Sequence, residues 1–471
     1  MISYAQRISN HAAADPDRAA ITDEHRTVTR AELQSLANRT ARVLAARGVV
    51  EGDNVTIGLP NRIEFVAAVI ACWKLGAVPQ PVSARLPERE LEAIIELANS
   101  KVVVRDVADL AAGADVDDGP LPDAVSRPWK AMTSGGSTGR PKLILAGTPG
   151  EIDPDALPGL QIRLNGTHMM PGPLYHNGPF VWSTTALLAG NHLVLGGKFD
   201  AERTLQLIDE HKPDSMYVVP TMMARIWKLP LSVRDRYDVS SLKVVWHLAA
   251  PCPPWLKEAW IEWLGADAIW ELYAGTEAQS VTIISGREWM EHRGTVGKTL
   301  AGEMKIVGPD GEDLPAGEVG EIFMRSSADG SVKTYEYVGA EAKTLPGGWE
   351  SLGDMGYMDA DGYLFLSDRQ TDMILVGGSN VYPAEVEAAL DEHPHVKSSA
   401  VIGLPDDDLG SRVHAIIHTD DGKPIDDDEM RTHLADRLVR YKTPRTYEYT
   451  DEALRDDAGK VRRSALRDER L

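Results

Sequence analysis

Apolar residues recur along the first hundred positions with two alternating spacings. A capping box formed by Thr29 and Glu32 begins an amphipathic helix, whose apolar face repeats every three or four residues until Gly48 ends it. Continuous apolar runs then predict three buried strands, at 55–59, 78–82 and 102–104. The segments between these runs predict two helices, at 64–75 and 88–97. Such alternation is typical of parallel strands covered by helices.

The pattern changes beyond residue 294, where short apolar runs are separated by Gly, Asp and Pro turns. Runs at 321–325 and 362–367 predict an antiparallel, barrel-like part. The last stretch, about 100 residues long, has the size of a small domain. Its pattern predicts an α+β unit, with elements at 384–390, 400–402, 413–417 and 428–439. We therefore predict an α/β protein with a large N-terminal domain of layered α/β sheets, a small β-barrel-like part and a small α+β C-terminal domain.

Composition and charge narrow the classes of partner. The chain has 471 residues, 43% of them hydrophobic, and a formal net charge of −22, which disfavours nucleic acid and anionic membrane surfaces. Its longest apolar run, at 65–73, is shorter than the roughly 18 residues of a membrane helix. Two cysteines, Cys72 and Cys252, are too few for a zinc site and fit reduced core thiols. We expect a cytoplasmic protein without an integral membrane segment.

A stretch rich in glycine and hydroxyl residues, Thr-Ser-Gly-Gly-Ser-Thr-Gly-Arg-Pro-Lys at 133–142, is the chief candidate for chemistry. Its three glycines let backbone N–H groups approach an anion closely. Side chains add hydroxyl donors and positive charge, at Thr133, Ser134, Ser137, Thr138, Arg140 and Lys142. The combination predicts a phosphate-binding loop.

Other interpretations of this loop have to be weighed. A Walker A loop requires Lys directly after its last glycine, whereas Gly139 is followed by Arg140 and Pro141. The letters Gly-Gly-Ser-Thr-Gly also match a nucleophile elbow, which would make Ser137 the nucleophile of a hydrolase. An elbow must run into a helix, and Pro141 disfavours the helical conformation at the residue before it. The hydrolase and an ordinary surface turn remain as alternatives.

Three later segments carry side chains suited to chemistry on a phosphate. His176 lies in a Pro- and Gly-rich turn, although a single histidine in a turn is usually a surface residue. Glu277 comes two residues after Gly275, and a carboxylate in such a turn suits Mg²⁺. Gly459 lets a C-terminal loop carry Lys460 into a cleft, unless this segment is a solvated basic end.

Taken in this order, the segments resemble the adenylate-forming superfamily of acyl-CoA synthetases, nonribosomal adenylation domains and luciferases over essentially the whole chain. The forms Thr-Ser-Gly-Gly-Ser-Thr-Gly-Arg-Pro-Lys, Pro-Leu-Tyr-His-Asn-Gly-Pro-Phe and His-Leu-Ala-Ala-Pro-Cys-Pro are most similar to bacterial bile-acid or steroid acyl-CoA ligases. The resemblance implies an ATP-dependent acid–CoA ligase. Such an enzyme forms an acyl-adenylate and passes the acyl group to CoA, with ATP, Mg²⁺ and CoA as its small-molecule partners.

The resemblance also implies a role for each segment. The β- and γ-phosphates of ATP would be held by Thr133, Ser134, Gly135, Gly136, Ser137, Thr138, Gly139 and Lys142. The nucleoside, the α-phosphate and the metal would be contacted by Tyr273, Thr276, Glu277, Asp354 and Arg369, with Glu277 as the Mg²⁺ ligand. Catalysis would involve Lys460, Thr276 and Glu277. The acyl pocket would be lined by His176, Asn177, Gly178, Ala249, Ala250 and Gly275.

Two working positions of the C-terminal domain are a further implication of the resemblance. An N-terminal adenylation domain (1–368) would be joined by a hinge (369–371), in which Thr371 absorbs the rotation, to a mobile lid domain (372–471). Lys460 would face the phosphates in one position. In the other position, a tunnel for CoA would be lined by Gly377 and Gly378. Four residues depart from commoner family forms without removing a charged catalytic group: Leu143, Ala274, Leu352 and Thr371.

The motifs leave the acid open. Small residues in the pocket predict a wide apolar space for a bulky alicyclic acid, such as a steroid or bile-type carboxylate, at Gly178, Ala249, Ala250 and Gly275. A medium-chain or aryl acid is the alternative, as is transfer to a carrier-protein thiol instead of CoA. A non-catalytic ATP-binding protein is disfavoured because the charged site residues are all present. A homodimer is a further expectation.

Overall fold

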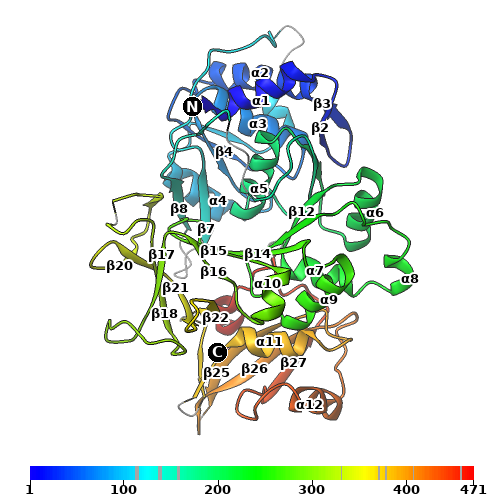
Figure 1. Ribbon diagram of the computed structural model, residues 1–471, viewed down its shortest axis with the longest axis vertical. Helices are drawn as coiled ribbons and strands as arrows, with labels where there is room; N and C mark the ends of the chain where they lie inside the picture. The colour runs from blue at the N-terminus through cyan, green and yellow to red at the C-terminus, as the bar shows by residue number, and fades with distance from the viewer. Residues whose placement is uncertain are drawn as a thin grey trace.

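The computed structural model describes residues 1–111, 116–135, 141–155, 160–329, 331–369, 372–376, 379–406, 408–456 and 459–471 (Figure 1). A large α/β part occupies the upper and middle regions of the view, and a smaller α+β unit made of the C-terminal residues lies below it (Figure 1). The largest hydrophobic core belongs to the α/β part, and the C-terminal unit and the barrel-like part each have a core of their own. The predicted fold class is confirmed.

The central element is a nine-stranded sheet in the order β16-β15-β14-β13-β12-β10-β11-β2-β3. Its six inner strands, from β14 to β2, are parallel, whereas the outer pairings are antiparallel. In chain order the strands are β2 (Ala19–Thr22), β3 (Thr27–Thr29), β10 (Thr167–Met170), β11 (His192–Leu195), β12 (Ser215–Val218), β13 (Val244–His247), β14 (Ile269–Tyr273), β15 (Val281–Ser285) and β16 (Lys298–Ala301). The helices that accompany it are α1 (Tyr4–Ala14), α5 (Asn177–Leu188), α6 (Ala201–His211), α7 (Pro220–Trp227), α8 (Leu231–Arg234), α9 (Pro254–Leu264) and α10 (Gly286–Glu291).

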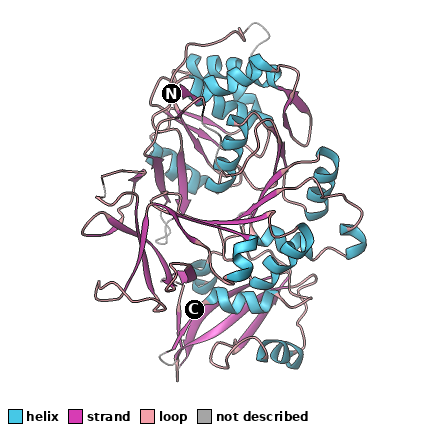
Figure 2. Ribbon diagram, in the orientation of Figure 1, coloured by secondary structure: helices cyan, strands magenta, loops and turns pink. Residues whose placement is uncertain are grey.

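A second, three-stranded parallel sheet confirms the alternation predicted for the first hundred residues. Its strands are β5 (Val78–Pro81), β4 (Asn54–Ile57) and β6 (Val102–Val104), with β4 in the middle. Its helices, visible in the upper region of Figure 2, are α2 (Arg30–Ala46), α3 (Ile63–Lys74) and α4 (Glu88–Ala98), followed by the short 3₁₀ helix η1 (Val107–Leu110). α2 begins at the predicted capping box of Thr29 and Glu32. α3 is buried along its whole length, as its continuous apolar sequence requires.

Antiparallel pairing prevails in the remaining strands of the large part. β7 (Ala131–Gly135) and β8 (Pro141–Ala146) form a hairpin, which β19 (Tyr335–Val338) extends to three strands. β1 (Ile2–Ser3) pairs with β9 (Glu151–Ile152). The predicted barrel-like part is a five-stranded sheet of β17 (Glu303–Val307), β18 (Gly320–Arg325), β20 (Lys343–Leu345), β21 (Trp349–Met358) and β22 (Leu364–Arg369).

The C-terminal unit contains the predicted mixture of helices and strands. They are β23 (Ile374–Val376), β24 (Ser379–Val381), α11 (Pro383–Asp391), β25 (Ser398–Asp406), β26 (Gly410–His418), α12 (Asp427–Ala435), β27 (Thr446–Thr450) and α13 (Arg463–Asp468). β25 and β26 are nine residues each, longer than the apolar runs suggested, because the antiparallel ladder continues through polar residues at both ends. α12 ends at Ala435, four residues before the predicted limit of 439. The domain limits at 368 and 372 and the hinge stay predictions, and Gln370 and Thr371 lie outside the described residues.

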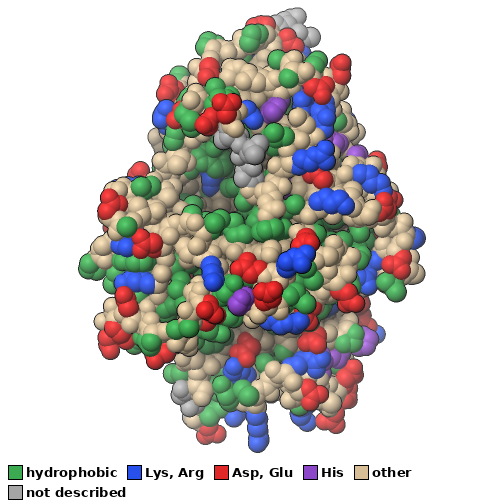
Figure 3. Space-filling view, in the orientation of Figure 1, with side chains coloured by type: hydrophobic (Ala, Val, Ile, Leu, Met, Phe, Trp, Pro, Cys, Tyr) green, Lys and Arg blue, Asp and Glu red, His purple; other side chains and the backbone are tan. Residues whose placement is uncertain are grey.

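Acidic and basic side chains are interspersed over the face in Figure 3. Among the described residues, no helix combines the length and the apolar character needed to cross a bilayer. Both cysteine thiols are free, and Cys72 is buried in the core.

The contacts that join the C-terminal unit to the large part include two at the start and end of α7. The Lys228 ammonium, at the end of α7, donates to the carbonyl oxygens of Asp391 (2.7 Å) and Val396 (2.5 Å). Gly459 lies against Thr221 so closely that a Cβ atom at this position would come within 2.6 Å of the Thr221 hydroxyl oxygen. Residue 459 has φ +77°, which also favours glycine. The loop that carries Lys460 is therefore held against the start of α7.

One buried carboxylate organises the interior of the C-terminal unit. Glu387, on α11, is 4% exposed and accepts hydrogen bonds from the guanidinium groups of Arg455 (2.7 Å) and Arg463 (2.9 Å). Its other oxygen accepts the backbone N–H of Val401 at 2.9 Å. Arg455 in turn donates to the carbonyl oxygen of Gly459 at 3.1 Å. The carboxylate therefore links helix α11 and strand β25 to the segment that presents Lys460.

We predict that Glu387→Ala lowers the free energy of unfolding of the C-terminal unit by about 3–5 kcal/mol, because the partly buried Arg455 loses its carboxylate partner and Arg463 keeps only Asp372. Urea unfolding followed by limited proteolysis of the C-terminal unit measures the change. The matched control is Glu385→Ala on the same helix, where a half-exposed pair with Lys442 should contribute less than about 1 kcal/mol. Equal losses in the two variants would contradict the prediction.

Candidate active site

A cleft of 3060 Å³ lies between the large part and the C-terminal unit and is lined by both. Its walls include the β7–β8 hairpin, the N-terminus of α5 and the segments that follow β12, β13 and β14. Open parallel sheets bind ligands at the carboxyl ends of their strands, so this is the expected location of chemistry. From the C-terminal unit, residues 453–456 and 459–463 also line the cleft.

The end of β14 presents the first group of predicted residues. The Tyr273 hydroxyl donates a hydrogen bond to Asp354 Oδ2 at 2.8 Å, which joins the nine-stranded sheet to β21 of the barrel-like part. The following turn closes through the backbone hydrogen bond from Ala278 N–H to Gly275 C=O at 3.1 Å. Thr276 and the Glu277 carboxylate lie in this turn, beside the cleft.

Glu277 is 5% exposed and is held by residues from two other strands. The Lys142 ammonium, on β8, lies 3.4 Å from its Oε1 and 4.0 Å from the ring centroid of Tyr337 on β19. The Tyr337 hydroxyl donates to the same oxygen, and the Thr334 hydroxyl donates to the Glu277 backbone carbonyl at 2.7 Å. Burial, with the Glu277 charge, raises the pKa of Tyr337, so the phenol stays a donor. Sequence reasoning missed Tyr337 and Thr334, since neither lies in a recognisable motif.

The hairpin explains how the predicted phosphate loop is presented. Ser134 is opposite Lys142 and Gly135 is opposite Pro141 in its register, so the ends of β7 and β8 hold the two ends of the loop together. Thr133 accepts a hydrogen bond from Gln80 at 2.7 Å, which fixes its side chain. The described residues leave out the Ser134 side chain and all of Gly136, Ser137, Thr138, Gly139 and Arg140.

The strand that follows the loop tests whether Ser137 could be the nucleophile of a hydrolase. A nucleophile elbow requires a helix directly after the serine turn. Here β8 starts at Pro141 and pairs with β7, so a strand occupies the positions into which the helix of an elbow would have to run. The alternative of a Ser137 hydrolase is therefore wrong on structural grounds.

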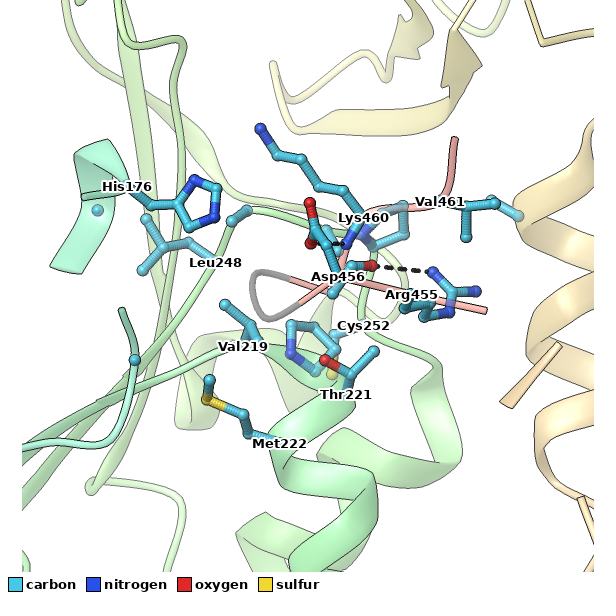
Figure 4. Close-up of a pocket in the computed structure, with 18 of the residues that line it drawn as sticks. His176, Val219, Thr221, Met222, Leu248, Cys252, Arg455, Asp456, Lys460 and Val461 are labelled. Atoms are coloured by element: carbon cyan, nitrogen blue, oxygen red, sulfur yellow. Dashed lines mark hydrogen bonds between the residues drawn. The ribbon is translucent and has the colours of Figure 1, made fainter. Parts of the chain in front are cut away.

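Lys460 and His176 enter the cleft from its two sides (Figure 4). The Lys460 backbone N–H donates to Asp456 Oδ1 at 2.9 Å, which orders the loop that carries it. His176 is the residue before α5, and among the described residues its Nε2 has no hydrogen-bond partner although it is buried. Burial lowers the pKa of His176 to about 4, and the charge of Lys460 acts in the same direction. The imidazole is therefore neutral at pH 7.

Two of the predicted small pocket residues do not leave open space. A Cβ atom at Gly178 would lie 2.3 Å from the Tyr217 hydroxyl oxygen, and one at Gly275 would lie 2.3 Å from Leu352 Cδ1. Glycine fits at these positions because neighbouring side chains already occupy the volume that a larger residue would need. The premise that they widen the acyl pocket is therefore wrong. Ala249 and Ala250 do line the cleft, and Ala249 has φ +74°, an uncommon conformation for a residue with a Cβ atom.

Aromatic rings form the wall behind Gly178. The Trp182 ring lies 5.3 Å from Tyr217 and 5.8 Å from Trp246, between ring centroids, in edge-on arrangements. Trp182 and Tyr217 line the cleft. A wall of this kind offers flat, edge-to-face contacts to a planar ligand. The sequence contained these residues, but nothing in their spacing indicated that they face the same cavity.

Lys130, just before β7, is a second functional candidate that sequence reasoning missed. It is 5% exposed, lines the cleft and donates from its ammonium to the side-chain oxygen of Asn177. Burial lowers the pKa of Lys130 to about 7, while the Glu277 charge opposes this shift. In the sequence, Lys130 lies between the apolar residues Trp129 and Ala131, which is the pattern of an ordinary buried strand and does not single out the lysine.

The remaining predicted residues are placed only in part. The Arg369 backbone is opposite Asp354 in the β21–β22 register, whereas its side chain lies outside the described residues. Gly377, Gly378 and Thr371 also lie outside them, so the tunnel and the hinge stay predictions.

Comparison with known proteins gives matches over nearly the whole chain. A family described as "AMP-binding enzyme" matches residues 8–335, and "AMP-binding enzyme C-terminal domain" matches residues 385–460. A feruloyl-CoA synthase from Amycolatopsis sp is 31% identical over 97% of this chain and 96% of its own. A fatty acid–[acyl-carrier-protein] ligase from Streptomyces coeruleorubidus is 29% identical over 99% and 96%.

Solved structures agree with these matches. The o-succinylbenzoate CoA synthetase from Bacillus subtilis, in complex with its acyl-adenylate intermediate, has a TM-score of 0.80 at 27% identity, covering 98% of this chain and 97% of its own. The same synthetase has been solved with ATP and a magnesium ion, with a TM-score of 0.78.

We predict that Gly178→Ala lowers the free energy of unfolding by about 1–3 kcal/mol, because the added methyl group overlaps the Tyr217 hydroxyl. Thermal unfolding measures the loss. Combining Gly178→Ala with Tyr217→Leu removes the overlapping ring, so the double variant should lose less than the sum of the single variants. A Gly178→Ala protein that melts at the parental temperature would show that the pocket wall is looser than described.

Proposed function

We propose that this chain, which belongs to the AMP-binding enzyme family, is an acid–thiol ligase that joins an aromatic carboxylic acid to coenzyme A through an acyl-adenylate. The observation that carries the proposal is the convergence of four distant segments on one cleft. They supply the Tyr273–Asp354 pair, the buried Glu277 with Lys142, and Lys460. No protein nucleophile is needed for this reaction.

The first step joins two anions. An oxygen of the carboxylate attacks the α-phosphorus of ATP, and the bond to pyrophosphate breaks. The step is slow in water because like charges must meet, so groups that bind the developing charge more tightly than the ground state supply the catalysis. We assign Lys460 to the bridge between the attacking carboxylate and the α-phosphate, and Thr276 to a hydrogen bond with that phosphate.

The nucleotide has a matching set of side chains. We assign Tyr273 to the face of the adenine and Asp354 to the ribose hydroxyls, since a carboxylate accepts both of their protons. Arg369 is adjacent to Asp354 across the ladder and would support the sugar. The loop 133–142, including Lys142, would hold the β- and γ-phosphates.

The residues present fit Mg²⁺. Mg²⁺ keeps several waters and binds one or two carboxylates together with phosphate oxygens, and it does not require an all-protein cage. Among the described residues no cluster of three acidic, histidine or cysteine ligands exists, and Glu277 is the single buried carboxylate in the turn beside the cleft. The metal would add positive charge at the α-phosphate, with Glu277 as its protein ligand.

In the second step the thiol of CoA attacks the acyl carbonyl carbon, and AMP leaves with the bonding electrons. We propose that the C-terminal unit, described here with Lys460 at the cleft, rotates about 369–371 so that Gly377 and Gly378 line the path of CoA. A cytoplasmic location and a homodimer are further proposals.

An aryl acid suits the pocket better than a steroid. The rings of Trp182 and Tyr217 support a planar ligand, and the space at Gly178 and Gly275 is already filled. A feruloyl-CoA synthase is among the relatives at 31% identity. The second candidate is transfer to a carrier-protein thiol, which the similarity to a fatty acid–[acyl-carrier-protein] ligase favours. A medium-chain or bile-type acid is a weaker candidate.

We predict that the purified protein releases one pyrophosphate and one AMP per thioester formed, and only when a carboxylic acid is present. Ferulate and benzoate should give a higher kcat/KM than hexanoate or cholate. Coupled pyrophosphate release and mass detection of the acyl-CoA measure both. ADP as the product would overturn the adenylate mechanism, and cholate as the best acid would overturn the aryl assignment. Thioester on an acyl carrier protein but not on CoA would establish the second candidate.

Lys460→Ala is expected to slow acyl-adenylate formation by more than about a hundredfold, the order for losing one preorganised charge at a developing anion. Thioester formation from supplied acyl-adenylate should largely survive, because Lys460 acts in the first step. The matched control is Lys423→Ala, an exposed lysine on the same unit. Equal losses in both half-reactions would mean that Lys460 supports the fold instead.

A further inference from the structure

The main chain of Lys130 lies away from Lys142 and the phosphate loop, although the Glu277 charge still acts on the Lys130 ammonium. Its backbone carbonyl accepts the N–H of Ala146, at the far end of β8 from Lys142. Ala146 is four positions beyond Lys142 along the strand, which places the two main-chain positions about 13 Å apart at roughly 3.3 Å per residue. Lys130 therefore joins the cleft at the opposite end of the hairpin from the phosphate loop.

The surroundings of the Lys130 ammonium are aromatic and amide in character. The nitrogen lies 5.1 Å from the centroid of the Trp129 ring, and Trp129 stacks on Phe180 of α5 at 5.7 Å between centroids. The Asn177 oxygen takes one of its protons. An ammonium has three protons to donate, and the described residues offer it this single hydrogen-bond acceptor.

The Lys130 ammonium also has no carboxylate beside it among the described residues. Among the described residues no carboxylate lies within 4.0 Å of its nitrogen, and Glu277, the one that acts on it at longer range, is already held by Lys142 and Tyr337. A buried cation without an anion is costly, and a structural contact between β7 and α5 does not need one. A ligand that brings an anionic oxygen to this point would relieve the cost.

We propose that Lys130 recognises a second, anionic oxygen on the acid, carried by its aromatic ring at the end remote from the reacting carboxyl group. The inference rests on the proposed ligase function and narrows its substrate class to aryl acids with a carboxylate or phenolate substituent. Lys130 is then a specificity-determining residue, and Asn177 positions its ammonium. The aromatic wall holds the ring between the two charged ends.

Paired acids separate this role from a structural one. Benzoate is compared with isophthalate and terephthalate, and 4-methoxycinnamate with 4-hydroxycinnamate, by kcat and KM of pyrophosphate release. The parental protein should prefer the member with the additional anionic or acidic oxygen at least tenfold in at least one pair. Lys130→Met should abolish this preference through a 10- to 100-fold higher KM, the order for a hydrogen bond to a charged group. Its kcat and its rate with the simpler acid should change little.

Two further variants complete the test. Lys130→Arg keeps the charge and should retain part of the preference. Lys74→Met removes another buried lysine, on α3 outside the cleft, and should retain all of it. Activity with the simpler acid shows that each variant is folded.

Three results would overturn the inference: no preference in the parental protein, a preference that survives in Lys130→Met, or an equal loss for both members of each pair. The last result would assign Lys130 to holding Asn177 alone. If no carboxylic acid at all drives pyrophosphate release from the parental protein, the ligase function itself fails, which is a distinct outcome. A preference restricted to the dicarboxylates or to the phenol identifies which anionic oxygen the site takes.

Discussion

The buried carboxylate of Glu277 is the interaction on which the cleft depends. It lies at the end of β14 in the nine-stranded sheet, yet its partners Lys142 and Tyr337 come from β8 and β19 of the hairpin sheet. A carboxylate that is 5% exposed requires charge and hydrogen bonds to stay ionised, so these strands have to meet there. The contact between these strands also brings the two ends of the predicted phosphate loop close to the end of β14, which carries Tyr273. In the proposed reaction the same group would also bind the metal, so one residue would have both a structural and a chemical task.

A second constraint operates between the two parts of the chain. Lys460 is useful only if its loop reaches the cleft, and that loop rests on Thr221 through Gly459. Glu387 and Arg455 hold the loop from inside the C-terminal unit, while Lys228 holds the unit from outside. The Lys228 contact is polar, which would suit the rotation proposed for this unit. Large apolar interfaces would bind the unit permanently.

The acyl pocket shows how a residue type misleads when its neighbours are unknown. Gly178 and Gly275 suggested open volume, whereas Tyr217 and Leu352 occupy it. Glycine at these positions permits close packing instead of creating a cavity. The pocket is thereby walled by aromatic rings, and the buried Lys130 lines the same cleft. Its selectivity would arise from ring shape and from charge together.

The sequence by itself determined the elements and the classes of chemistry. Local signals such as the Thr29 capping box and the continuous apolar run of α3 act over a few residues, so their structures follow from short-range physics. Tertiary structure alone decided which side chains meet. Tyr337 joins Glu277 across 60 residues and Lys130 joins Asn177 across 47, through strand pairing and helix packing that leave no trace in local spacing. Burial also belongs to the tertiary structure. A lysine or glutamate surrounded by low-dielectric protein is costly unless it has a hydrogen bond or an opposite charge beside it.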